Sequence, residues 1–188
     1  YRIPLTTAVG GPYNMDSGTI AAWGQQDLPV DATAIYPPSQ VPSGTPPTSY
    51  TRATVTYMNI DGQAVNIAQP GGGITTTEHD DIGRDIRTLT PSNRAAALAV
   101  SSTDTALQAA EARQLDTTTT YDADGLPTDT YGPAHAVDTP TGGHTQARAH
   151  VHNTYDEGAP GGATFGLVTT STESARPTDR SAEFDART

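Results

Sequence analysis

The chain has 188 residues, enough for one ordinary domain, but only 34% of them are hydrophobic. Its formal net charge of −11, with Arg as the sole basic residue besides His, excludes the basic surface that nucleic-acid binding requires. The absence of Cys excludes disulfides and Cys-based zinc sites, and no apolar run approaches the roughly 20 residues that cross a bilayer.

Residues 1–50 are rich in Pro, with Pro37-Pro38, Pro42 and Pro46-Pro47 close together among Ser and Gly. This composition predicts an extended or irregular segment, and we interpret it as a linker that lies along a larger body. Within it, the run Ile20–Trp23 suggests a short helical turn that packs the only Trp.

Residues 51–90 predict antiparallel β-hairpins. Ala53, Val55 and Tyr57 alternate with polar residues, a period of two that is typical of a half-buried strand. Asp and Gly then supply the turns. The expected elements are a strand over 51–57, a turn at 61–62, a strand over 64–68, a turn at 70–73, a strand over 74–79, a turn at 80–83 and a strand over 84–89.

Residues 91–115 predict an inserted helical hairpin. Thr90 or Ser92 can cap the first helix, and the Ala-rich run after Asn93 has high helix propensity. The polar run 101–103 interrupts it, and a second helix is expected from about Asp104. Leu107 and Leu115 are eight residues apart, which predicts that they share one face of this helix.

Residues 116–173 predict further hairpins, and residues 174–188 a polar continuation toward a next repeat. On the strand over 147–155, Ala147, Ala149, Val151 and Tyr155 are expected on one face and Arg148, His150 and His152 on the other. The other expected elements are a strand over 117–121, a turn at 122–125, a return strand at 129–131, a loop over 133–144, a turn at 156–162 and a strand over 164–173.

One short phrase recurs along the chain: an aromatic residue, Asp and a turn glycine. Its clearest copy is Tyr121-Asp122-Ala123-Asp124-Gly125, and in a second His79 takes the aromatic position before Asp80-Asp81-Ile82-Gly83. Tyr155-Asp156-Glu157-Gly158 is one residue shorter, and the phrase from Tyr57 to Gly62 is one residue longer. Repetition of a hairpin unit favours an extended repeat architecture over one compact catalytic domain.

These phrases resemble the YD repeats of RHS-repeat proteins, which include large secreted actinobacterial proteins. The resemblance covers about residues 50–173, although the intervals between the phrases are uneven. It implies a mainly β fold, in which antiparallel hairpins form part of a β-shell similar to the cocoons of teneurins and insecticidal toxins. In polymorphic toxins of this kind, the shell encloses a C-terminal toxic domain.

The resemblance further implies a structural role in a large secreted or cell-surface bacterial protein. The expected partners are the remainder of that protein and an enclosed toxin domain, with glycans as a further possibility and with neither nucleic acid nor a membrane span. A glycan- or protein-binding β module is the alternative function. We interpret the chain as a piece of a longer protein, and we expect no enzymatic activity from these residues.

Two kinds of motif carry side chains that can bind metal ions, and both favour a structural explanation. His150 and His152 place two imidazoles on one strand face near His144, which suits zinc or copper. However, no Cys and no well-spaced carboxylate completes that site, so we expect solvent-facing histidines and no bound metal. Asp80-Asp81 and the run Asp122–Gly125 resemble calcium loops without the EF-hand spacing, which favours turn chemistry.

Other chemical motifs also have ordinary structural explanations. No Gly-x-Ser-x-Gly motif occurs, and Pro70–Gly73 lies between strands instead of preceding a phosphate-binding helix. Paired acids such as Glu78 with Asp80 or Asp156 with Glu157 do not by themselves define a catalytic pair. The recurring aromatic positions Tyr57, His79, Tyr121 and Tyr155 are expected to pack between strands. The sequence therefore yields no catalytic, cofactor-binding or metal-binding residues.

Overall fold

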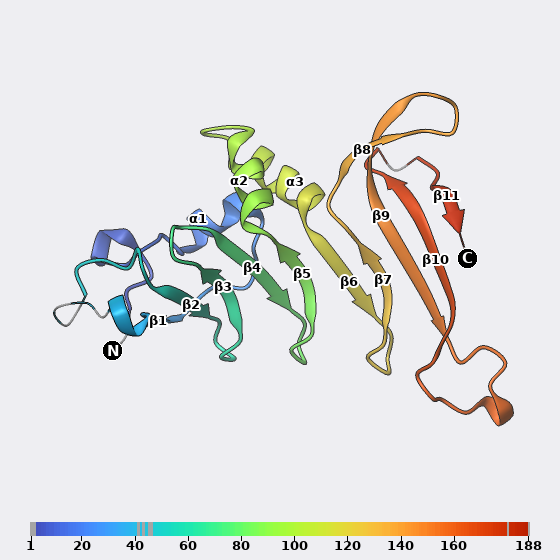
Figure 1. Cartoon of the computed structure of the whole chain (residues 1–188), viewed down its shortest axis with the longest axis horizontal. Coiled ribbons are helices and arrows are strands. Elements are labelled where there is room, and N and C mark those ends of the chain that lie inside the picture. The colour runs from blue at the N-terminus through green and yellow to red at the C-terminus, as the bar shows by residue number, and fades with distance from the viewer. Residues whose placement is uncertain (1–2, 41, 43, 45–46, 180, 188) are drawn as a thin grey trace. The chain divides into compact units, whose positions relative to one another are not determined.

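A computed structural model of the chain describes residues 3–40, 42, 44, 47–179 and 181–187. In these residues the fold is mainly β, with antiparallel strands that follow one another as meanders and with few short helices (Figure 1). The chain divides into two compact units, Tyr1–Arg113 (unit 1) and Gln114–Thr188 (unit 2). The mainly β prediction is confirmed.

The strands of unit 1 lie side by side in chain order, and each neighbouring pair is antiparallel. They are β1 (Asp31–Ile35), β2 (Thr54–Met58), β3 (Ala64–Ala68), β4 (Ile74–His79) and β5 (Asp85–Leu89). The short helical elements before and between them are η1 (Thr7–Val9), α1 (Ser17–Ile20), η2 (Ala21–Trp23) and η3 (Pro38–Gln40). Two longer helices, α2 (Pro91–Ala99) and α3 (Thr105–Leu115), follow β5.

The core of unit 1 lies on one face of its sheet. Val55, Tyr57 and Leu89 are completely buried, and Trp23 is 1% exposed. The predicted turn around the Trp is confirmed as η2. Burial of side chains of this size stabilises a fold by about 1.5–3 kcal/mol each, so this cluster contributes strongly to the stability of unit 1.

A buried polar network joins the N-terminal segment to the same sheet. The Gln25 side-chain amide donates to the Asn66 side-chain oxygen at 2.9 Å, and the Trp23 indole N–H donates to Gln25 at 2.7 Å. Arg87 pairs with Glu78 at 2.6 Å and donates to the backbone carbonyl of Trp23 at 2.8 Å. These side chains are buried away from water, so the hydrogen bonds among them replace those that water would otherwise make.

The prediction for residues 1–50 is therefore wrong in part. Ile3, Met15, Ile20 and Trp23 from this segment form part of the core, and β1 extends the sheet beyond β2. The Pro content does not prevent this, because the strand and the buried side chains precede the Pro-rich stretch that begins at Pro37. Pro46, one of the quoted prolines, lies outside the described residues.

Five hairpin turns share one hydrogen-bond pattern. The amide of the first turn residue donates to the carbonyl of the fifth, and the amide of the glycine at position four donates back to the first carbonyl. That glycine always has a positive φ, which is 86° at Gly125. At four of the turns this pattern fits a type I turn closed by a glycine bulge, which favours the twist of antiparallel strands; the Gln69 turn differs, because Gly71 also has a positive φ, of 95°. The five turns start at Asn59, Gln69, Asp80, Asp122 and Thr139.

The two predicted helices are confirmed, and Leu107 does not lie on the buried face of α3. Thr90 caps α2 by accepting from the amide of Asn93, and Asp104 accepts from the amide of Leu107 at the start of α3. Leu107 is 49% exposed, whereas Gln108 and Ala112 are buried. The Gln108 amide donates to the carbonyls of Leu98 and Ser101, which draws this face inward.

Unit 2 is built around one long strand, β9 (His144–Tyr155). Its first part pairs with β8 (His135–Asp138), and its second part pairs with β7 (Pro127–Tyr131). Apart from β8, the strands of this unit lie in the order β6 (Thr117–Tyr121), β7, β9, β10 (Val168–Pro177) and β11 (Phe184–Arg187). The short helix η4 (Pro160–Gly162) lies in the loop before β10. All of these pairings are antiparallel.

Two predictions for unit 2 are corrected. Residues 133–144 were expected to be a loop, but β8 and the Thr139–Gly143 turn form a further hairpin with β9. Residues 174–188 were expected to continue toward a next repeat, but β10 runs to Pro177 and β11 folds back against it. Within the described part of the chain, no helix has the length and apolar character needed to span a membrane.

Candidate functional site

The richest cluster of ionisable side chains in unit 2 lies where β7 meets β9. Arg148, His150 and His152 alternate along β9, so their side chains share one face of the sheet. The register pairs Asp129 of β7 with His152 and Tyr131 with His150. Directly opposed residues on antiparallel strands have neighbouring side chains, so the carboxylate lies beside both imidazoles.

Both imidazoles contact the same carboxylate oxygen. His150 Nε2 lies 2.9 Å and His152 Nδ1 lies 2.7 Å from Oδ1 of Asp129. Candidate ligand atoms of the three residues all lie within 4.8 Å of one another. The His150 side chain is 11% exposed and that of His152 is 46% exposed, so the cluster opens to solvent on the His152 side.

Glu183 holds the other edge of His150. Its Oε2 lies 3.0 Å from His150 Nδ1 and accepts from the Ser174 hydroxyl at 2.6 Å. Its Oε1 accepts from Arg176 at 2.9 Å. The His150 ring also stacks on Tyr131, with ring centroids 4.2 Å apart and planes 10° from parallel. Asp129, Glu183 and Tyr131 thus fix the position and orientation of the imidazole.

Both carboxylates of the cluster are strongly biased toward the ionised form. Burial alone raises the pKa of Asp129, but hydrogen bonds from His150, His152 and Thr128 outweigh it and bring the pKa to about 2. Burial likewise opposes ionisation of Glu183, and hydrogen bonds from Ser174, His150 and Arg176 bring its pKa to about 2. The cluster therefore carries two fixed negative charges at neutral pH.

Arg148 braces the same strands next to this cluster. Its guanidinium donates to the buried Asp116 carboxylate at 2.9 Å and to three backbone carbonyls, those of Asp116, Gly132 and Tyr131. The Asp116 side chain is 1% exposed and that of Arg148 is 14% exposed. This ion pair links the start of β6 to the end of β7 and to β9.

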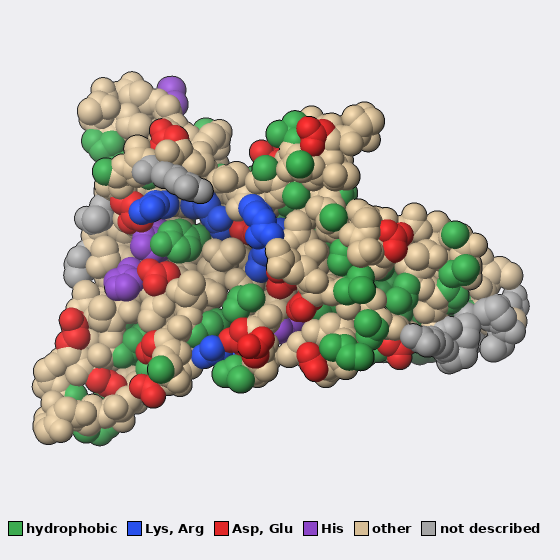
Figure 2. Space-filling model, turned by 180° about the vertical axis from the view of Figure 1, so that it is seen from behind, with side chains coloured by type: hydrophobic (Ala, Val, Ile, Leu, Met, Phe, Trp, Pro, Cys, Tyr) green, Lys and Arg blue, Asp and Glu red, His purple; other side chains and the backbone are tan. Residues whose placement is uncertain are grey.

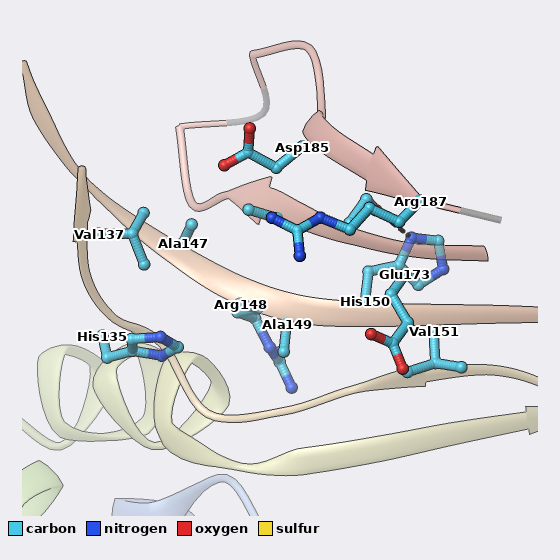
Figure 3. A pocket seen from close by; sticks show the side chains of 12 residues that line it. His135, Val137, Ala147, Arg148, Ala149, His150, Val151, Glu173, Asp185 and Arg187 are labelled. Atoms are coloured by element: carbon cyan, nitrogen blue, oxygen red, sulfur yellow. Dashed lines mark hydrogen bonds between the residues drawn. The ribbon is translucent and has the colours of Figure 1, made fainter. Parts of the chain in front are cut away.

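A pocket of about 370 Å³ borders β9 and β10. Its lining combines small apolar side chains with Glu173, Asp185 and Arg187, as Figure 3 shows. Figure 2 shows histidine side chains of unit 2 next to acidic and basic ones on the face that it presents. Of the cluster formed by Asp129, His150, His152 and Glu183 (the β7–β9 cluster), His150 lines this pocket.

Two expectations about the histidines are corrected. His150 was expected to face solvent, but it is largely covered by Tyr131 and its acidic neighbours. No well-spaced carboxylate was expected to complete the pair, but Asp129 does so from 21 residues away in the sequence. His144, which lies near the pair in the sequence, instead forms a separate exposed pair with Asp138 at 2.6 Å.

The two calcium-like motifs have the turn role that was predicted. Asp80 accepts from the amides of Ile82 and Arg84, and Asp122 accepts from those of Asp124 and Leu126. These bonds from the turn amides lower the pKa of Asp80, the largest contribution coming from the amide of Arg84. Their carboxylates therefore close the hairpin turns.

The acids that lie close together in the sequence each have their own hydrogen-bond or ion-pair partners. Glu78 pairs with Arg87, and Asp80 pairs with Arg84 at 2.6 Å. Asp156 accepts from three amides of the loop that follows β9, and the Thr154, Thr169 and Thr170 hydroxyls surround Glu157. Each acid is thus engaged by its own partners, and the Gly-rich run at 70–73 forms one of the five turns.

The aromatic positions of the recurring phrase are not equivalent. Tyr57 is completely buried, and burial raises its pKa, whereas Tyr121 and Tyr155 are only half-buried. Met58, not Tyr57, occupies the position before the turn that His79 and Tyr121 occupy in their copies. The Tyr155 copy does not close a tight hairpin, because Asp156 pairs with Leu167 across a long loop.

Sequence reasoning identified the two histidines but missed Asp129 and Glu183. Asp129 carries a weak signal, since it alternates with Thr128 and Thr130 on a return strand that was predicted. Its partner on β9 depends on a register that the sequence does not specify, because β8 intervenes along the chain. Glu183 lies in a segment without strand periodicity.

Comparison with known proteins does not identify a family. A scan against models of protein families finds no match, and a search of curated proteins finds none either.

Proposed function

We propose that the chain is a structural section of an RHS-repeat β-shell in a large secreted or cell-surface bacterial protein. In this proposal the sheets form a wall that encloses or presents a toxin or effector domain, and their side chains stabilise that wall. The remainder of the same protein and its enclosed domain are the partners. The chain itself performs no catalytic reaction in this role.

The observation that carries the proposal is the hairpin turn that recurs five times with one hydrogen-bond pattern. Two of the five copies, those at Asp80 and Asp122, follow His79 and Tyr121 in the phrases that resemble YD repeats. Antiparallel meanders with uniform turns tile readily into extended sheets, in which each strand covers the edge of the next.

The decisive test is the size and content of the natural polypeptide. Antibodies against residues 1–188 would isolate it from the medium and surface of the producing cells, and mass spectrometry would define its length. We expect a polypeptide far longer than 188 residues, with further tyrosine–aspartate phrases on both sides, that electron microscopy shows as a hollow particle. A free chain of about this length, or a long one without such phrases, would contradict the proposal.

A glycan- or protein-binding β module remains the alternative, and one observation favours it. A pocket of about 230 Å³ is lined by Tyr155 together with Asp122, Asp124 and Asp156, and it combines an aromatic ring with carboxylates. Glycan-array binding that disappears in Tyr155→Ala or Tyr121→Ala, with the folded state intact, would support this function over the shell.

A further inference from the structure

We propose that Asp129, His150 and His152 form a binding site for a divalent transition-metal ion of the zinc class. Two imidazole nitrogens and one carboxylate are a donor set that zinc and its first-row neighbours bind in proteins. The site goes beyond the shell proposal and does not depend on it. It would cross-link β7 to β9 in a unit that has little apolar core.

The first argument is geometric. A tetrahedral ion with bonds of about 2.0–2.2 Å separates its donor atoms by about 3.3–3.6 Å. The two nitrogens already lie 2.9 and 2.7 Å from Oδ1 of Asp129, and all candidate donor atoms lie within 4.8 Å. The two N···O separations must therefore widen by about 0.4–0.9 Å to admit the ion, an adjustment of side chains that leaves the strand register unchanged.

The second argument counts protons. Three contacts join imidazole nitrogens to carboxylate oxygens: His150 Nε2 and His152 Nδ1 to Asp129, and His150 Nδ1 to Glu183. An ionised carboxylate only accepts, and a neutral imidazole carries a single N–H. The contacts of His150 to Asp129 and to Glu183 are both hydrogen bonds only when this ring carries a proton on each nitrogen. A metal ion at Nε2 replaces one of these protons and leaves the other on Nδ1, where it is donated to Glu183.

The third argument concerns the residues around the ligands. A histidine that binds metal usually donates its other N–H to a carboxylate, which fixes the tautomer and orients the ring. Glu183 has this position, and it is itself held by Ser174 and Arg176. Glu183 is thus a positioning residue for His150. The more exposed His152 leaves the remaining coordination position open to water.

Calorimetric titration of the full 188-residue chain with ZnCl₂ tests the site. We expect saturable binding of one ion per chain, weakened at least tenfold in Asp129→Ala and in His152→Ala. The matched control is His144→Ala, which removes a histidine of the same strand that also pairs with an aspartate but has no second imidazole beside it. This control should bind as tightly as the unmodified chain.

The positioning role has its own pair of variants. Glu183→Gln should weaken zinc binding about 10- to 100-fold, because it removes the carboxylate that accepts from His150. Glu173→Gln, on the neighbouring strand β10, should leave the affinity unchanged. Equal effects of the two variants would assign the change to overall charge and would overturn the role of Glu183.

A measurement on the unmodified chain tests the site even where the variants do not fold. Addition of zinc should shift the imidazole nitrogen resonances of His150 and His152 in NMR spectra and leave those of His135 and His144 in place. The absence of saturable binding, an equal loss in His144→Ala, or shifts spread over all of these histidines would overturn the proposal. None of those outcomes bears on the size of the natural polypeptide, so the two proposals fail separately.

Discussion

Unit 1 buries Trp23, Tyr57 and Leu89 almost completely, whereas Ala147 and Pro177 are the only buried aliphatic or aromatic side chains among the described residues of unit 2. Unit 2 instead connects its strands with charged groups, from the Arg148–Asp116 pair to the β7–β9 cluster. The same hairpin turn occurs in both units. The same turn thus connects strands in two units that differ in what stabilises them: apolar burial in unit 1 and charged groups in unit 2.

The difference follows from composition along the chain. The strands of unit 1 alternate Val, Ile, Leu and Tyr with polar residues, and they are covered by side chains from the N-terminal segment. The strands of unit 2 are dominated by Thr, Asp, His and Arg. Apolar burial does not depend on pH, metal ions or salt in the way that ion pairs do, so the two units should respond differently to each.

The largest expected effect is loss of the apolar core in unit 1. Trp23→Ala should lower the free energy of unfolding by about 3–5 kcal/mol, because it removes a buried ring and leaves a cavity. Urea unfolding followed by far-ultraviolet circular dichroism measures this change. Val9→Ala, at a side chain that is 69% exposed, should stay within about 0.5 kcal/mol of the unmodified chain. Similar losses in both variants would contradict the assignment of the core.

The next largest effect should come from the ion pair of unit 2. Arg148→Met leaves the buried Asp116 carboxylate without its charged partner and should cost about 3 kcal/mol. Arg176→Met, at an exposed arginine paired with Glu183, should cost no more than about 1 kcal/mol. The same urea measurement compares them, and an equal cost would show that burial of the Arg148 pair is unimportant.

Acid should destabilise unit 2 through Asp129 and Glu183. Their pKa values fall to about 2 on folding, from ordinary values of 3.8 and 4.5, so the folded state binds fewer protons than the unfolded state. Their contribution is therefore present above about pH 4.5 and is lost as the pH falls toward 2. We expect on the order of 1 kcal/mol from each group, since both are partly exposed.

Thermal unfolding between pH 6 and pH 2, with EDTA present, measures this contribution. Asp129→Asn should show a shallower decline in melting temperature over that range than the unmodified chain, and Asp138→Asn, at the exposed His144 pair, should not. A decline that is unchanged in Asp129→Asn would contradict the electrostatic assignment.

The smallest effect should come from substitution of the turn glycines, and it should be the same in both units because both contain this turn. Gly62 and Gly142 occupy equivalent turn positions with φ of 79° and 86°, and a Cβ would meet nothing within 4 Å at either. Alanine at each position should cost about 1 kcal/mol through backbone strain alone. Asparagine should cost less, since it tolerates this conformation better. Very different costs at the two positions, again measured in urea, would show that the turns are not equivalent.

Local rules predicted the parts of the fold that local rules determine. The Asp–Gly turns, the strand over Ile74–His79 and the cap of α2 all depend on residues close in the sequence. The turns and the strand were placed correctly, and the cap is Thr90, one of the two predicted candidates. By contrast, β1, β8 and β11 form because a neighbouring strand offers an open edge. Their own periodicity is too weak to predict them.

The candidate site shows the same division. His150 and His152 share a face because strand side chains alternate, which the sequence reveals directly. Asp129 reaches them only because β7 pairs with the second half of β9 and β8 with the first half. Asp129 was therefore not predicted as a partner, because it lies far from the histidines in the sequence. The strand register nevertheless brings its carboxylate within 3 Å of both rings.

Hydrogen exchange of the full chain at neutral pH, with EDTA present, tests the contrast between the units most directly. Amides paired in β2–β5 should exchange more slowly, after correction for intrinsic rates, than those paired in β7, β9 and β10, because opening unit 1 exposes its apolar core. Added zinc should slow exchange in β7 and β9 only. Equal protection in both units, or stronger protection in unit 2 without metal, would contradict the account.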